Sequence, residues 1–192
     1  MKSLEEKILR EGSAIGTEIL KVDSFLNHRI DVRFMDEIGA EIARLFAGRG
    51  INKILTVEAS GIAVACAASR HMGYVPAVFA KKAAPNTMTE DFYAAEAKSF
   101  TKGTVSMLRV AKQYLSPGDR VLIVDDFLAS GEAGVALVSL ARNAGAEVVG
   151  FSAVIEKKWQ GGADRLRELG IDLKSLVVIA AINDGKITFA DN

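Results

Sequence analysis

The chain has 192 residues, of which 49% are hydrophobic, and it contains 3 prolines and 17 glycines. This length and composition fit one globular domain with a small elaboration, and they exclude disordered, collagen-like and low-complexity chains. The 24 lysines and arginines equal the 24 aspartates and glutamates, so the chain lacks the basic excess typical of nucleic-acid-binding proteins. Its longest apolar runs, residues 62–68 and 176–182, are far shorter than the ~20 residues that span a bilayer. We therefore expect neither nucleic acid nor a membrane as a partner.

The single cysteine, Cys66, cannot form an intramolecular disulfide. It lies within an apolar run, where we expect a small buried thiol. Residues 1–10 alternate charged and aliphatic side chains and lack the apolar core of a signal peptide. We therefore expect a reduced, cytoplasmic protein.

The first part of the chain reads as helix, helix, strand, helix and strand. Aliphatic residues three and four positions apart indicate the helices, and short runs rich in β-branched residues indicate the strands. In chain order these elements are expected at residues 3–10, 31–48, 51–57, 61–73 and 74–80.

Apolar density then falls between Lys81 and Gly103. A loop of this length inside a compact domain is usually functional or mobile. We therefore expect a loop here, with a lid over residues 88–102 that covers bound substrate.

The second part of the chain returns to alternating strands and helices. In chain order, we expect a strand at 104–110, a turn at 116–119, a strand at 120–124 that ends on two aspartates, a helix at 131–144, a strand at 146–155, a helix at 162–169, a strand at 175–182 and a hairpin into 187–189.

Strands that are apolar throughout and alternate with helices indicate a parallel sheet buried on both faces. We expect an α/β fold in one domain over residues 1–192, with a roughly five-stranded parallel core at about 36–158. Residues 1–35 and 159–192 fit the alternation least well. They are expected to form a small hood over the carboxyl ends of the strands, where open α/β sheets bind their ligands.

The most informative stretch runs from residue 121 to residue 133. It combines a buried strand, the adjacent carboxylates Asp125 and Asp126, a short loop and a helix that opens with small residues. The backbone amides at the helix start and the Ser130 hydroxyl would hold an anion, and Gly131 would let a phosphate approach the backbone. The carboxylates would accept hydrogen bonds from vicinal hydroxyls or help to hold a divalent cation. These two halves predict a ligand that carries a phosphate and a diol, as a phosphorylated ribose does.

This stretch resembles the phosphoribosyl-diphosphate signature of the type I phosphoribosyltransferases. Residues 20–28 and 154–157 make the whole chain similar to the xanthine branch of that family. The resemblance implies transfer of 5-phosphoribosyl from its 1-diphosphate to xanthine N9, with Mg²⁺ as cofactor and a homodimer as assembly. It identifies no side chain as a metal ligand.

The resemblance also implies roles for particular residues. Asp125 and Asp126 would bind the ribose 2′ and 3′ hydroxyls. The 5-phosphate would be bound by Ala129, Ser130, Gly131, Glu132 and Ala133. The diphosphate would meet Ser60 and Gly61 in the turn after the first strand, and Lys81 with Lys82, in related enzymes sometimes from the neighbouring subunit. The nucleobase would contact Leu20, Asn27, Lys157 and Trp159.

One position departs from the hypoxanthine–guanine enzymes. Their loop carries an aspartate, thought to take the purine proton, where this chain has Ala129. A fixed general base is therefore excluded at that place. Two alternatives stay open: a phosphoribosyltransferase for guanine or hypoxanthine, and a nucleotide-sensing regulator that uses the same fold without turnover.

Overall fold

A six-stranded sheet forms the centre of the protein. The computed structural model describes residues 1–82, 91–99, 104–183 and 185–190. The strand order is β10–β9–β8–β7–β3–β4, in which the five strands from β9 to β4 pair in parallel and β10 pairs antiparallel with β9. The strands are β3 (Lys53–Val57), β4 (Ala77–Ala80), β7 (Arg120–Leu128), β8 (Glu147–Lys157), β9 (Leu173–Asn183) and β10 (Lys186–Phe189). The expected parallel α/β core of five strands is confirmed.

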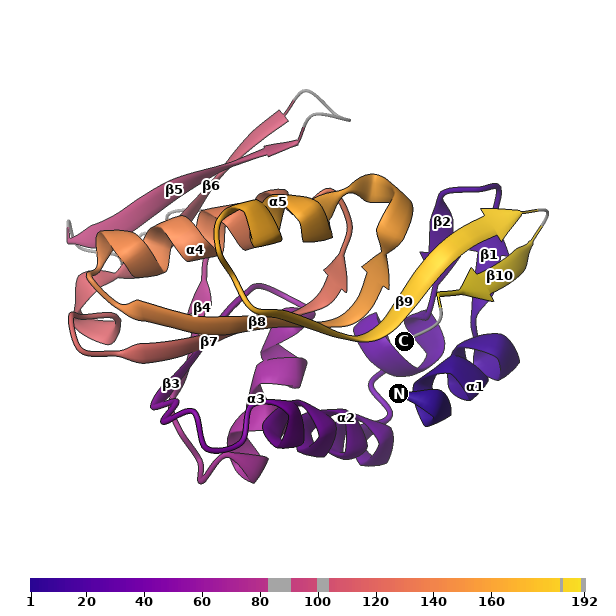
Figure 1. Cartoon of the computed structure of the whole chain (residues 1–192), viewed down its shortest axis with the longest axis horizontal. Helices are drawn as coiled ribbons and strands as arrows, with labels where there is room; N and C mark the ends of the chain where they lie inside the picture. The colour runs from indigo at the N-terminus through magenta and orange to yellow at the C-terminus, as the bar shows by residue number, and fades with distance from the viewer. Residues whose placement is uncertain (83–90, 100–103, 184, 191–192) are drawn as a thin grey trace.

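Helices cover both faces of this sheet (Figure 1). On one face lie α2 (Val32–Leu45) and α3 (Gly61–His71), with α1 (Lys2–Glu11) beside α2. On the other face lie α4 (Glu132–Asn143) and α5 (Gly162–Glu168). Asp31 is the N-cap of α2, at the end that faces the hood in the chain. Its Oδ1 accepts a hydrogen bond of 3.1 Å from Phe34 N and so satisfies a backbone amide of the first helical turn.

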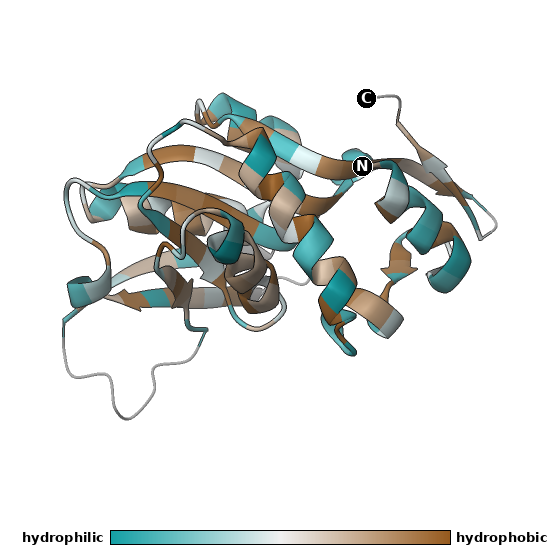
Figure 2. Ribbon diagram, turned by 90° about the horizontal axis from the view of Figure 1, so that it is seen from below, coloured by the Kyte–Doolittle hydropathy of each residue, from teal (hydrophilic) through white to brown (hydrophobic). Residues whose placement is uncertain are grey.

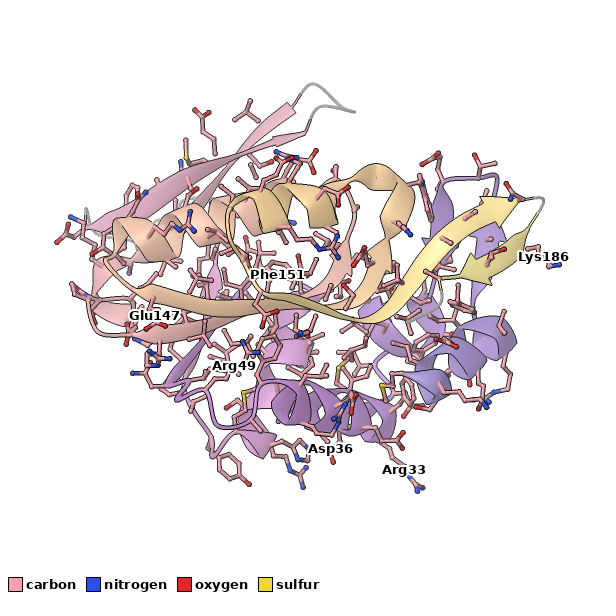
Figure 3. The ribbon with its side chains drawn as sticks, in the orientation of Figure 1. Arg33, Asp36, Arg49, Glu147, Phe151 and Lys186 are labelled. Atoms are coloured by element: carbon pink, nitrogen blue, oxygen red, sulfur yellow. The ribbon has the colours of Figure 1, made fainter. Side chains whose placement is uncertain are left out.

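Two apolar clusters fill the space between the layers. One contains the buried faces of α1, α2 and α3, and the other contains those of α4 and α5. Figure 2 shows the strands brown along much of their length and the helices banded in brown and teal, as expected for a sheet buried between amphipathic helices. Phe151 of β8 lies between the sheet and the α4–α5 layer (Figure 3).

A small hood stands at one end of the sheet. It consists of the antiparallel pair β1 (Ser13–Ile15) and β2 (Ile19–Lys21), followed by the π-helical turn η1 (Asp23–Asn27). The far end of β9 and strand β10 reach the same region (Figure 1). Since β9 pairs with β8 from Phe151 to Lys157, most of the C-terminal segment belongs to the main sheet, and its distal hairpin reaches the hood.

The segment expected to be a single long loop contains a strand. β5 (Phe92–Ser99) pairs antiparallel with β6 (Thr104–Ala111), and the hairpin packs on α4 outside the main sheet. The prediction of a continuous loop over residues 81–103 was wrong at β5, because alternate residues such as Tyr93 and Ala95 pack against the α4 cluster. The two ends of the expected lid, at 88–90 and 100–102, lie outside the described residues.

Two further expectations need correction. β7 does not end at its aspartates but continues to Leu128, pairing Phe127 with Ile155 of β8. Cys66 is exposed and not buried, because α3 packs through Val64, Ala65 and Ala68 and turns Cys66 outward. Short 3₁₀ helices, η2 (Lys112–Tyr114) and η3 (Lys158–Gln160), complete the fold.

No helix within the described residues is both long and apolar enough to cross a bilayer.

Candidate active site

The site lies where β3 and β7 run side by side in parallel. The chain leaves β3 through α3 and returns to β4 on one side, whereas it leaves β7 through α4 and returns to β8 on the other. The two helices lie on opposite faces of the sheet (Figure 1). The carboxyl ends of β3 and β7 therefore flank a topological switch point, the place at which open α/β sheets bind ligands.

Asp125 and Asp126 project from β7 at this point, and their environments differ. Asp125 is buried, while Asp126 is partly exposed. Burial raises the pKa of Asp125 well above its usual value, and the neighbouring Asp126 carboxylate raises it further. The Asp126 amide, which donates to Asp125 Oδ1 at 3.0 Å, and the charge of Lys82 oppose that rise in pKa. The carboxyl group of Asp125 is thus desolvated and fixed by a hydrogen bond, whereas the carboxyl group of Asp126 is accessible to solvent.

The loop after β7 forms the start of α4. Gly131 is the N-cap in the left-handed region, with φ of 83°, and the first intrahelical bond runs from Val135 N to Gly131 O at 2.9 Å. The amides before Val135 have no acceptor within the helix, so they are available to an anion. The Ser130 hydroxyl donates to Glu132 Oε2, and Glu132 Oε1 is buried with no partner among the described residues.

This loop is braced from behind by the start of α5. Gly162 N donates to Ala129 O at 3.0 Å, and an Arg165 guanidinium nitrogen donates to Ser130 O at 2.6 Å. A Cβ built on Gly131 would lie 2.9 Å from Gly162 Cα. The reason expected for Gly131, space for a phosphate, therefore needs correction, because its missing side chain faces Gly162. No local sequence pattern marks Gly162 or Arg165, because their contacts with the loop span about 30 residues.

A second turn approaches the acids from β3. The peptide between Glu58 and Ala59 is cis, and α3 begins at Gly61. A Cβ on Gly61 would lie 2.1 Å from Thr56 Oγ1 and 3.2 Å from Asp125 Oδ1. Only glycine lets the start of α3 pack this closely against both. Ser60, the N-cap, makes no side-chain cap, and Thr56 Oγ1 is buried with no partner among the described residues.

The two lysines after β4 differ in position. Lys81 N and O pair with Arg109, and its Nζ lies 5.9 Å from the centre of the Phe79 ring. Lys82 N donates to Glu58 Oε1 at 2.6 Å, and the Lys82 charge lowers the pKa of Asp125. Lys82 is therefore the lysine with the clearer electrostatic link to the carboxylates, and Lys81 lies at the edge of the sheet.

The four residues expected at the nucleobase occupy the hood and the end of β8. Leu20 is buried in β2, and Asn27 is exposed at the end of η1. Lys157 closes β8, with Nζ 5.6 Å from the centre of the Phe127 ring, and burial lowers its pKa. Trp159 lies in η3, two residues further on.

Lys157 and Trp159 both contact a hood residue, Glu18, that no local sequence pattern marks. Lys157 Nζ donates to the backbone oxygen of Glu18 at 2.9 Å, and Trp159 Nε1 donates to Glu18 Oε2 at 3.1 Å. The residues are about 140 positions apart in the chain. These contacts join the hood to the strand that carries Lys157.

The described residues contain no group of three or more metal-ligating side chains. Asp125 and Asp126 together offer two adjacent carboxyl groups. This donor set fits Mg²⁺, which is commonly held by one or two carboxylates together with substrate oxygens.

Sequence and structure comparisons agree with this geometry. The family model described as "Phosphoribosyl transferase domain" matches residues 21–183. The chain belongs to the phosphoribosyltransferase family. It is 48% identical to a curated protein of Laribacter hongkongensis named xanthine phosphoribosyltransferase, over 98% of this chain and 100% of the relative. A Bifidobacterium longum subsp. infantis protein of the same name is 49% identical, over 98% of this chain and 99% of the relative.

Solved structures of adenine phosphoribosyltransferases share the fold of this phosphoribosyltransferase. The enzyme from Rhodothermus marinus superposes with a TM-score of 0.74 at 21% identity, covering 93% of this chain and 100% of the other. The enzyme from Thermoanaerobacter pseudethanolicus gives a TM-score of 0.68 at 26% identity, covering 77% and 82%.

Proposed function

We propose that this phosphoribosyltransferase moves 5-phosphoribosyl from 5-phospho-α-D-ribose 1-diphosphate to N9 of xanthine, giving xanthosine 5′-monophosphate and diphosphate. One observation carries the proposal: the carboxyl groups of Asp125 and Asp126 in β7 lie at the switch point, next to the start of α4, where the first backbone amides have no acceptor within the helix. The names of the full-length relatives support xanthine as the base.

The donor would bind with its two ends on different elements. Asp125 and Asp126 would accept hydrogen bonds from the ribose hydroxyls, and residues Ala129 to Ala133 would surround the 5-phosphate. Ser60 and Gly61 at the start of α3 would present amides to the diphosphate, with positive charge from Lys81 and Lys82. This placement leaves the ribosyl C1 between the leaving diphosphate and the base.

The chemistry would consist of one substitution at that carbon. The C1–oxygen bond to diphosphate breaks and the C1–N9 bond forms. Because Ala129 supplies no base, the purine would lose its proton to water, to a solvent-linked group or before it binds. The protein would contribute positioning and electrostatic stabilisation of the separated charges. When bound by Asp126, Asp125 and substrate oxygens, Mg²⁺ would supply neutralising charge to the diphosphate.

The base would lie between the hood and the end of β8. Lys157 would donate to a purine oxo group and so disfavour adenine, which has an amino donor at that position. Asn27, exposed at the end of η1, would donate to the second oxo group that distinguishes xanthine. Leu20 would supply apolar contact, and Trp159 would stack on the ring.

We also propose a homodimer and a cytoplasmic location. A homodimer is supported by the apolar Tyr74 and Phe79, which are exposed around the edge strand β4 close to Lys81. Light scattering of the purified protein would measure its molar mass in solution and so distinguish a dimer from a monomer. A cytoplasmic location is supported by the free, exposed thiol of Cys66, which suits a reducing compartment.

The test is a panel of xanthine, guanine, hypoxanthine and adenine, each mixed with the ribosyl donor and Mg²⁺ while nucleotide and diphosphate are measured. We expect xanthine to have the highest kcat/KM, then guanine, then hypoxanthine, with no turnover of adenine. A preference for guanine or hypoxanthine would replace xanthine as the substrate. Binding of nucleotide without release of diphosphate from any base would identify a sensor instead of an enzyme.

A further inference from the structure

We infer that Glu18 is a positioning residue for nucleobase binding: it fixes the side chains of Lys157 and Trp159 from the hood. The inference rests on the proposed function, because it concerns the base-binding side of the same site. It adds a residue to which neither the family match nor the names of the relatives give a role.

Three side chains from the end of β8 and from η3 converge on this one residue. Lys157 Nζ donates to Glu18 O at 2.9 Å, Trp159 Nε1 donates to Glu18 Oε2 at 3.1 Å, and Gln160 Nε2 donates to the same oxygen at 3.3 Å. Glu18 thus uses its backbone for the lysine and its carboxylate for the other two.

The position of Glu18 makes these contacts specific to the hood. It follows Gly16, which adopts a φ of 58°, in the tight turn between β1 and β2. The turn directs both acceptors of one residue toward a segment about 140 residues later in the chain. The Glu18 side chain is exposed, and yet it accepts hydrogen bonds from one indole and one side-chain amide. These bonds restrict its rotamers, which costs conformational entropy. Such ordering is expected where the geometry of the contacted groups matters.

The Glu18 charge also acts on the protonation of Lys157. Lys157 is half-buried, and this burial lowers its pKa, while the Glu18 charge raises it. The Lys157 ammonium also lies 5.6 Å from the centre of the Phe127 ring. Glu18 therefore opposes the effect of burial on the Lys157 charge, while its backbone oxygen and the Phe127 ring fix the direction of the ammonium group, whose remaining protons can be donated to an oxo group.

Replacing the side chain separates the two kinds of contact. Glu18→Ala removes the acceptor of Trp159 and Gln160 but keeps the backbone oxygen bonded to Lys157. Glu18→Gln keeps a neutral acceptor oxygen for Trp159. Glu6, exposed in α1, provides the matched control: Glu6→Gln removes the same charge from a side chain that makes no hydrogen bond or ion pair with the described residues.

The readout is the emission of Trp159, the single tryptophan of the chain. Xanthine, guanine and hypoxanthine are each titrated into the protein with diphosphate and Mg²⁺ present, and the dissociation constant is taken from quenching of that emission. Turnover then gives KM for the base and for the ribosyl donor, and thermal melting reports the fold.

For Glu18→Ala we expect a shifted emission spectrum of the free protein. The dissociation constant and KM for xanthine should rise by about tenfold, as for loss of a charge-assisted hydrogen bond. KM for the donor and the melting temperature should stay unchanged. Glu18→Gln should restore part of the base affinity, and Glu6→Gln should match the unmodified protein.

Unchanged emission and unchanged base affinity in Glu18→Ala would overturn the inference. Equal loss of base and donor affinity would also overturn it, because it would assign Glu18 to the general stability of the hood. If the unmodified protein binds xanthine but does not turn it over, the proposed function fails, while the quenching titrations still decide the role of Glu18. If it binds none of the bases, both proposals fail.

Discussion

Replacing Gly162 with alanine should weaken binding of the ribosyl donor, although this residue touches no part of the proposed ligand. A Cβ at Gly162 would lie 2.3 Å from Ala129 O and 2.7 Å from Gly131 N. These are backbone atoms of the loop that precedes α4, and no side chain can rotate to make room. The loop or the start of α5 must therefore shift.

The expected size of the effect follows from the cost of overpacking. A forced backbone shift of this kind costs about 1–3 kcal/mol. If the donor phosphate requires the loop in its present position, the same free energy appears as a rise of about 5- to 150-fold in the donor dissociation constant. The affinity for the base should fall much less.

Isothermal titration with the ribosyl donor and Mg²⁺ measures this change. Gly161→Ala is the matched control: Gly161 has a φ of 73° and no atom within 4 Å of an added Cβ. That variant should lose about 1–2 kcal/mol of stability from backbone strain and keep its donor affinity. Normal donor binding by Gly162→Ala, or an equal loss in both variants, would refute the role of Gly162 as a brace for the loop.

Three further substitutions give measurable outcomes. Asp125→Asn should abolish useful turnover yet stabilise the free protein at neutral pH. The carboxyl of Asp125 has a pKa near 3.8 in the unfolded chain and a raised pKa in the folded protein, so the folded state keeps this proton to higher pH. The free energy of unfolding of the unmodified protein therefore falls as the pH rises from 3.8 through the raised pKa. Urea melts across pH 4–8 should show a flatter pH dependence for the variant, and an unchanged slope would contradict the buried, proton-retaining carboxyl. Thr56→Val removes a buried hydroxyl without a partner among the described residues and should stabilise the protein by up to about 1–3 kcal/mol; a loss of stability in urea melts would reveal a partner such as ordered water. Asn27→Ala should reduce the preference for xanthine over hypoxanthine by about 5- to 150-fold, with donor KM unchanged, and equal losses with all bases would assign Asn27 to the hood instead.

The fold was largely predictable because each main strand is apolar and each helix has a regular apolar face. β5 was not predictable from its pattern, since Phe92–Ser99 is rich in alanine and carries Glu96, and its strand geometry depends on pairing with β6 and packing on α4. The end of β7 was misplaced because two carboxylates interrupt the apolar run. The backbone nevertheless continues its pairing with β8 to Leu128.

The candidate site divides in the same way. Asp125, Asp126 and the loop before α4 are contiguous, so their spacing already indicates a ligand with a diol and a phosphate. Glu18 and Gly162 act through contacts with residues far away in the chain, and no local pattern marks them. The close approach of Gly61 to Asp125 likewise depends on the pairing of β3 with β7, which the sequence alone does not specify.

The segment from Trp159 to Arg165 contacts the two protein elements that flank the proposed nucleotide product, the hood and the loop before α4. Trp159 and Gln160 bond to the hood over the base side, while Gly162 and Arg165 bond to the loop at the phosphate side. Its length therefore sets the separation between the two halves of the site, as a spacer of fixed size would. Inserting or deleting one residue here would change the distance from base to phosphate that the protein accepts, whereas changes in the base pocket alone would leave that distance intact. Redesign of base preference in this scaffold should therefore vary the hood and conserve the spacer.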